Sequence, residues 1–334
     1  MINKYKTMKK IILITFVLIA KFSFSQDCTR ELLAQKPGTW KAGQQGSING
    51  VSPTDLVKEK SVLAAIHKMV NTNYSPKGCQ VSYSTAYSKY PAGEVWIADP
   101  YSYTMYILPF LCDSKSADHS KYTVAISSAT NVTITANEIP SLNTLFAATI
   151  PADDSRGYLK LKQRPQKKDG HFNMGEEVVG DSQEENKIVE YRWLITYNDT
   201  LPFSEVSRKE YLLIQKKRLE KSIKESPGEK PYYQKFIDNV NDYLTKPEDE
   251  LNQTAICMSN DEERFSGFVE EGTKGSFIAV KPNMSYYRKN RPKSSPQFFT
   301  VIYKISHGDP VFEENIAAIK EATDFAALKN MLGK

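Results

Sequence analysis

The chain has 334 residues, of which 40% are hydrophobic and 25% charged, a composition that excludes wholesale disorder. Its 44 Lys+Arg against 39 Asp+Glu give a formal net charge of +5, but the first 25 residues hold five lysines and no acid. The rest of the chain carries 39 residues of each sign, so the electrostatic argument for binding nucleic acid or anionic lipid disappears.

Residues 1–25 have the pattern of a secretory signal peptide. A lysine-rich stretch precedes an apolar run over residues 11–20, and Ser23 and Ser25 supply the small residues of a cleavage site. We expect cleavage before Gln26 and a mature protein in the periplasm or outside the cell. The apolar run has about half of the ~20 residues that cross a bilayer, so a permanent anchor is the weaker interpretation. Asp27 before Cys28 does not fit a lipoprotein signal, and no later segment predicts a membrane span.

The four cysteines all follow this leader, and no two of them form a C-x-x-C pair. An even number of cysteines in an exported protein favours two disulfides over four thiols. Cys79 and Cys112 bracket a strand-rich stretch, so we expect them to pair with each other. Cys28 and Cys257 then form the second disulfide by elimination.

Residues 26–162 are predicted as a β-rich N-terminal part that begins with helices. A short helix is expected over residues 29–35, and the sequence Ser-Pro-Thr-Asp at residues 52–55 predicts the start of an amphipathic helix that runs to residue 71. From residue 80 the apolar pattern has a period of two, which is typical of half-buried strands. Strands are expected near residues 81–87, 94–98, 101–108, 122–126, 132–136, 145–150 and 158–161.

Residues 163–187 are polar, and we interpret them as a linker or long loop between two parts. Residues 188–334 are then an α+β C-terminal part. A strand over residues 190–197 precedes a capping box at residues 207–210 and an αα-hairpin that ends near residue 244. Further strands are expected at residues 265–269, 276–280 and 297–305, and helices near 311–322 and 324–332. The fold class is therefore α+β, a mainly antiparallel sheet with an N-terminal helix, a central αα-hairpin and C-terminal helices.

Motifs of nucleophilic, metal-dependent and nucleotide-binding enzymes are missing from the sequence: G-x-S-x-G, H-E-x-x-H, the Walker A loop and G-x-G-x-x-G. Asp118-His119 and the sequence His-Gly-Asp at residues 307–309 each combine a base with an acid, as many loops do. A glycosidase with two carboxylates stays open, because such acids meet only in space. The sequence assigns no catalytic residue, metal or cofactor.

Two aromatic stretches are candidates for contacting a ligand. Rings crowd residues 83–106, and tyrosine rings suit stacking on sugars or packing against a peptide, although most of them also fit the buried face of a strand. Tyr106 and Trp96 are the candidates in this stretch. Tyr286, Tyr287 and Arg288 begin a basic and aromatic stretch that suits a polyanion, and a charged loop between strands is the alternative.

Several blocks resemble exported proteins of Bacteroidota, a group without an assigned function. The leader ends in Ser-Phe-Ser-Gln, residues 193–203 read WLITYNDTLPF, residues 206–212 read VSRKEYL, and PQFF at residues 296–299 is followed by Asp324-Phe325. The resemblance implies the envelope or exterior of a Gram-negative cell, and it carries no catalytic residue across.

Three functions fit these observations. We prefer a secreted or periplasmic binding or envelope-associated protein without catalytic activity, whose partner is a glycan or a peptide. A secreted hydrolase of polysaccharide or peptide, with Asp, Glu or His as acid and base, is the first alternative. The second is an adaptor that contacts another protein through the helical hairpin.

Overall fold

The computed structural model describes residues 28–90, 96–113, 121–139, 159–180, 187–258 and 265–334. The predicted leader lies outside the described residues, as do residues 145–150 of the predicted strands. The chain folds into two β-sheets and seven α-helices within these ranges, which confirms the expected α+β class.

The larger sheet has ten strands, and apart from the parallel pairing of β1 and β2 with β3 its pairings are antiparallel. Its central path runs β1-β3-β4-β6-β14-β10-β9-β8, with β2 and β5 at its margins. The strands are β1 Thr39–Ala42, β2 Ile48–Asn49, β3 Cys79–Ser88, β4 Tyr101–Cys112, β5 Tyr122–Val124, β6 Asn131–Ala136, β8 Gln166–Lys168, β9 His171–Val178, β10 Ile188–Ile195 and β14 Phe299–Ser306.

The order of these strands corrects the predicted division into two parts joined by a linker. Strand β14 from the C-terminal end pairs with β6 on one side and with β10 on the other, so that Val301 lies opposite both Ile134 and Trp193. The predicted linker, residues 163–187, contains β8 and β9. One sheet therefore combines both predicted parts.

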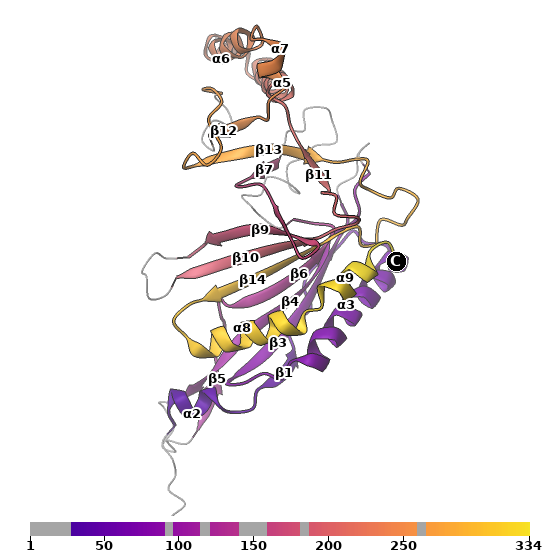
Figure 1. Cartoon of the computed structure of the whole chain (residues 1–334), viewed down its shortest axis with the longest axis vertical. Coiled ribbons are helices and arrows are strands. Elements are labelled where there is room, and N and C mark those ends of the chain that lie inside the picture. The colour runs from indigo at the N-terminus through magenta and orange to yellow at the C-terminus, as the bar shows by residue number, and fades with distance from the viewer. Residues whose placement is uncertain (1–27, 91–95, 114–120, 140–158, 181–186, 259–264) are drawn as a thin grey trace, which may run out of the picture.

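One face of the large sheet is covered by α3 (Pro53–Asn73), α8 (Pro310–Ala322) and α9 (Phe325–Met331), which lie side by side in Figure 1. Alternate residues of the strands point toward these helices and meet apolar residues such as Ile66 and Ile319 in one buried cluster. Each helix begins at a side-chain cap: Ser52, Asp309 and Asp324 accept hydrogen bonds from backbone N–H groups of the first turn. Short α2 (Arg30–Ala34) lies near the far end of the sheet (Figure 1).

The opposite face carries a second layer near β9 and β10. A four-stranded sheet is built from β7 (Leu159–Leu161), β11 (Phe203–Glu205), β12 (Ile256–Met258) and β13 (Ser276–Pro282). Ile278 and Val280 of β13 share a buried cluster with Leu194 of the large sheet. The other side of β13 packs with the hairpin of α5 (Arg208–Glu225) and α6 (Lys230–Tyr243), to which α7 (Glu248–Leu251) is added.

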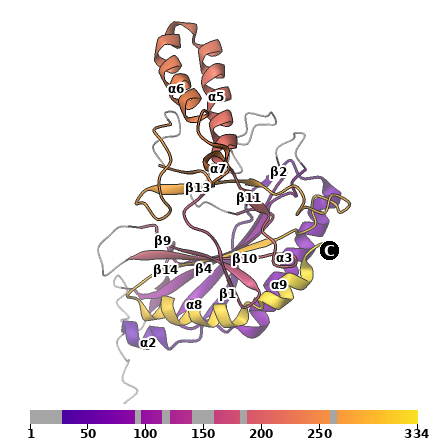
Figure 2. The ribbon, with the colours of Figure 1, turned by 45° about the horizontal axis from the view of Figure 1, so that its top comes forward.

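The predicted αα-hairpin is confirmed, and it projects away from the large sheet (Figure 2). Ile237 and Val240 on the apolar side of α6 are buried against α5 and the small sheet. Residues 265–269 were expected to form a strand, but they lie outside both sheets, with Val269 N–H donating to the carbonyl of Ile256. Phe265 is buried, so burial without strand pairing explains the misleading apolar pattern.

The predicted disulfide pairing is wrong. The structure joins Cys28 to Cys112, whereas Cys79 and Cys257 are buried thiols in two different clusters. Cys79 opens β3 opposite Pro109 of β4, and its side chain points into the core under the helices. Cys79 and Cys112 were expected to pair because they are close in sequence, but Cys28 lies at the end of β4 in space and pairs with Cys112 instead.

Within the described ranges, no helix combines the length and the apolar character that crossing a membrane requires.

Candidate functional site

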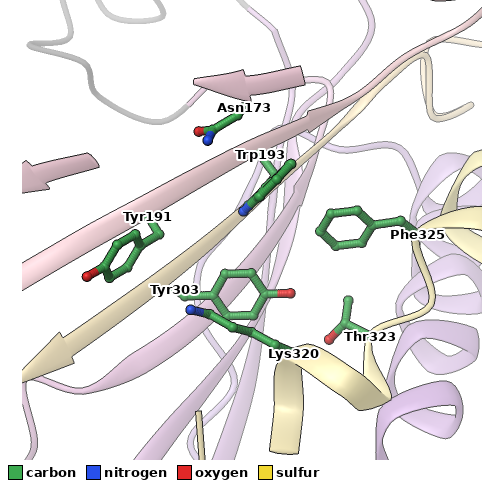
Figure 3. Close-up of a pocket in the computed structure, with 7 residues that line it drawn as sticks. All are labelled: Asn173, Tyr191, Trp193, Tyr303, Lys320, Thr323 and Phe325. Carbon is green, nitrogen blue, oxygen red and sulfur yellow. The ribbon is translucent and has the colours of Figure 1, made fainter. Parts of the chain in front are cut away.

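A cavity of about 310 Å³ opens where α8 and α9 leave part of the large sheet uncovered. Figure 3 shows the side chains that line it, from the strands β9, β10 and β14 on one side and from the two helices on the other. We call this cavity the aromatic groove; its lining residues are Asn173, Tyr191, Trp193, Tyr303, Lys320, Thr323 and Phe325.

Strand geometry explains why these side chains gather on one face. Tyr191 and Trp193 are two residues apart on β10, so both point to the helix-covered side. Tyr191 lies opposite Tyr303 of β14, and Trp193 lies opposite Asn173 of β9. Residues that pair directly across antiparallel strands have neighbouring side chains, so these four form a continuous surface.

The break between α8 and α9 opens the groove. Helix α8 ends at Ala322, Thr323 and Asp324 have extended backbones, and Asp324 Oδ1 then accepts a hydrogen bond from Ala327 N at 2.9 Å to start α9. This turn places Phe325 beside the sheet. Its ring centre lies 5.8 Å from that of Trp193 in a tilted arrangement, and 5.1 Å from that of His171 in a perpendicular one.

The rings of the groove differ in exposure. Tyr303 is buried at 1% exposure, and burial raises the pKa of its phenol well above the usual value. Tyr191, Trp193 and Phe325 are half-buried, so each presents part of a ring to solvent. A flat apolar surface with polar groups around it is what an aromatic binding site offers to a sugar or a flat ligand.

Polar groups at the edge of the rings are held in place. Asn173 Oδ1 accepts a hydrogen bond from Gly175 N at 2.8 Å, which fixes the amide and leaves its Nδ2 to donate to a ligand. Thr323 is buried; its Oγ1 donates to the carbonyl of Ile319 at 2.7 Å, and its side chain also forms a hydrogen bond with Tyr303.

Lys320 extends from α8 along the rings, with its amino group toward Tyr191 in Figure 3. Its Nζ lies 4.7 Å from the centre of the Tyr191 ring and 5.2 Å from that of Tyr303, within the range of cation–π attraction. Desolvation lowers the pKa of Lys320 from its usual value.

The rim near α9 carries a second set of charges. Asp199 lies between two lysines, 2.8 Å from Lys167 Nζ and 3.2 Å from Lys329 Nζ. These hydrogen bonds lower the pKa of Asp199. Burial and the charge of Lys329 lower the pKa of His171, so its ring is neutral at pH 7.

A chain of weaker contacts starts at the opposite end of the groove. Tyr191 Oη lies 3.4 Å from His307 Nε2, and His307 Nδ1 lies 3.3 Å from Glu313 Oε1. The acid beside His307 is therefore Glu313 and not Asp309, whose Oδ1 accepts from Val311 N to cap α8. A phenol, an imidazole and a carboxylate in this order are the components of an acid–base relay.

The residues proposed from sequence lie elsewhere. Tyr106 is 39% exposed on the opposite face of the large sheet, where Thr104 and Thr133 share a hydrogen bond. Trp96 is half-buried and packs edge-on against Tyr287, with ring centres 6.1 Å apart. Neither residue contributes to the aromatic groove.

The basic and aromatic stretch is largely part of the core. Tyr286 and Tyr287 are buried at 7% and 6% exposure, and Tyr286 Oη donates to the carbonyl of Gln297 at 2.7 Å. The guanidinium of Arg288 stacks at 3.7 Å over the ring of Tyr197. These three residues brace the loop before β14 and form no groove of their own.

The sequence placed Tyr191, Trp193 and Tyr303 in strands and Lys320 and Phe325 in helices but did not select them, and it missed the strand that carries Asn173. The alternation over residues 190–197 indicates that Tyr191 and Trp193 share a face. Their exposure depends on where α8 stops, and that depends on packing between segments over 100 residues apart in the sequence.

A second cavity, of about 650 Å³, lies between β7, β9 and the turn before β13. It is lined mainly by charged and backbone groups, and two of its members, Lys162 and Glu177, form an ion pair at 3.2 Å. Among the described residues no group of three or more His, Cys, Asp or Glu side chains is arranged to hold a metal ion. Comparisons of the chain with models of protein families, with curated proteins and with solved structures found no match.

Proposed function

We propose that the protein is an exported, non-catalytic binding protein that holds one or two sugar rings of a glycan in the aromatic groove. A volume of about 310 Å³ is at the lower end of the range for small-molecule sites, so the groove suits a short segment and not a long chain.

The half-exposed rings of Trp193 and Phe325 carry this proposal. They form two tilted walls with centres 5.8 Å apart, and the Nδ2 group of Asn173 lies on the strand opposite Trp193. A sugar has an apolar face of C–H groups and a rim of hydroxyls, and this combination of rings and donors complements both. A purely apolar ligand leaves the polar rim without a partner, which disfavours it.

The proposed export rests on two independent features. The leader has the signal-peptide pattern described above. The disulfide between Cys28 and Cys112 favours an oxidising compartment, because such bonds are rare in a reducing cytosol. The adaptor alternative loses support, since α6 uses Ile237 and Val240 for packing within the chain.

The test is a glycan screen on the mature, oxidised protein, followed by calorimetry on Trp193→Ala and on Tyr106→Ala. Tyr106 is a matched control, because it is a partly exposed aromatic residue on the opposite face of the same sheet. We expect Trp193→Ala to weaken binding about fivefold or more, in line with ~1–3 kcal/mol for stacking on an aromatic side chain. Tyr106→Ala is expected to leave it unchanged.

Two results would contradict this proposal. The first is a screen without any bound glycan. The second is binding that survives Trp193→Ala and is lost in Tyr106→Ala. The same glycans are assayed for new reducing ends, because their release would support the hydrolase alternative and the relay of Tyr191, His307 and Glu313.

A further inference from the structure

Lys320 is the charged residue among those that line the groove, and a neutral sugar offers it hydroxyl acceptors but no counter-ion. Its Nζ lies over the rings of Tyr191 and Tyr303, and the described residues offer it no carboxylate oxygen within 4 Å. The residues one turn earlier on α8, Ile316 and Ala317, are apolar. Lys320 is an exposed residue, so its ammonium is open to a ligand in the groove, and an anion placed over these rings is attracted to it.

The acids around the groove do not neutralise this cation. Glu176 lies opposite Tyr191 on β9 and is exposed; burial and then the charge of Glu176 raise the pKa of the Tyr191 phenol. Asp199 is already engaged by two lysines at the other end, Lys167 and Lys329. The lining of the groove itself holds Lys320 and no carboxylate, so the charge inside the groove is positive.

We propose that the ligand of the aromatic groove is an acidic sugar, a uronic acid whose ring contacts Trp193 and Phe325 and whose carboxylate pairs with Lys320. This inference rests on the proposed function and deepens it. Residues 191 and 193 are about 7 Å apart along β10, so a ring on Trp193 has its substituents above Tyr191, where the ammonium lies. A charge-assisted hydrogen bond then replaces the missing counter-ion.

Matched ligands separate the charge from the ring. Trisaccharides of glucuronate, galacturonate and mannuronate are each compared with their methyl esters, which keep the ring and remove the charge. Calorimetry on the mature, oxidised protein is expected to show at least tenfold tighter binding of one acid than of its ester. This preference is expected to decrease as salt is raised, because exposed ion pairs are screened.

Variants then assign the preference to one residue. We expect Lys320→Met to remove the preference for the acid over its ester, and Lys320→Arg to retain most of this preference. Lys217→Met is the matched control, since Lys217 is an exposed lysine on α5, far from the groove. It is expected to behave like the wild type.

The outcomes distinguish this inference from the proposed function. Equal binding of acid and ester, weakened in both by Trp193→Ala, would refute the acidic ligand and leave sugar binding intact. A preference for the acid that persists in Lys320→Met would refute the role of Lys320. Absence of binding to all six trisaccharides would refute the uronic acid, and a negative result in the wider screen would refute the sugar as well.

Discussion

Glu59 occupies a position in α3 where an apolar residue is expected. It lies on the same stripe as Leu63, Ile66 and Val70, and like them it is buried. Neither carboxyl oxygen has a hydrogen-bond partner among the described residues. Burial and, secondarily, the charges of Asp99 and Asp55 raise the pKa of Glu59 to about 8. Glu59 is therefore protonated in the native state at neutral pH.

This pKa shift predicts how stability depends on pH. The unfolded state releases the proton of Glu59 near pH 4.5, whereas the native state keeps it up to about pH 8. Between these values the native state binds more protons, so the free energy of unfolding falls as pH rises. Each pKa unit is worth ~1.4 kcal/mol, which puts the decrease in the free energy of unfolding on the order of 5 kcal/mol.

Glu59→Met is expected to remove this dependence and to stabilise the protein at pH 8, because a thioether fits an apolar stripe without ionising. Urea unfolding of the wild type and of Glu59→Met at pH 5 and pH 8 measures both the pH dependence and the stabilisation. Glu314→Gln on α8 changes an exposed acid and serves as the control. An unchanged pH dependence in Glu59→Met would show that the native carboxyl is already ionised or solvated.

At the level of elements, a β-bulge in β9 determines which residue of that strand lies opposite Trp193 in the groove. The register between β9 and β10 shifts between Arg192 and Trp193, and Gly175 at the shift has a φ of +93°, in the region that favours glycine. The bulge lets Asn173 lie opposite Trp193, and Gly175 N–H donates to the side chain of Asn173. The conformation of one glycine thus sets the position of a polar group in the groove.

We expect Gly175→Ala to lower the free energy of unfolding by about 1 kcal/mol and to weaken ligand binding. Gly170→Ala is the matched control, because Gly170 has a φ of +77° and open space around its Cα. It carries a similar backbone penalty in the turn between β8 and β9 without altering the bulge. Thermal unfolding and calorimetry of both variants test this. If both weaken binding equally, the effect comes from general destabilisation and not from Asn173.

Local signals explain which elements were predictable. Ser52 and Ser207 cap helices as expected, each accepting a hydrogen bond from the N–H group three residues later. Strand β9 was missed because its acids suggested a solvated loop. In the structure, Glu177 pairs with the buried Arg192 at 3.2 Å, and Arg192 pairs with Glu190 at 2.5 Å. Neighbouring strands thus give charged residues ion-pair partners that the sequence of a single strand does not reveal.

On the scale of the whole molecule, the order of the layers differs from the order of their segments in the sequence. Helices, large sheet, small sheet and hairpin are stacked, and the chain passes between layers several times. The pairing of β14 with β6 joins residues more than 160 positions apart, so no local sequence pattern predicts it. The division into two parts, the linker and the cysteine pairing all failed because each assumed that neighbours in sequence are neighbours in space.

The disulfide between Cys28 and Cys112 tests this arrangement directly. It ties the start of the described chain to the end of β4 across a sequence separation of 84 residues. Burial raises the pKa of the Cys79 thiol to about 12, so this residue is protonated and unreactive in the native state. We therefore expect the mature protein, denatured without a reductant, to react with two equivalents of an alkylating reagent, at Cys79 and Cys257.

In the chain-entropy view, closing a loop of this size stabilises the native state by up to about 4.5 kcal/mol, and engineered losses usually cost ~2–4 kcal/mol. The double variant Cys28→Ser/Cys112→Ser is expected to lower the free energy of unfolding, measured in urea, by ~2–4 kcal/mol. Cys257→Ser, which leaves the disulfide intact, controls for the change of sulfur to oxygen. Alkylation of all four cysteines would contradict the disulfide, and alkylation of none would contradict the two thiols, because Cys79 and Cys257 would then be in disulfides as well.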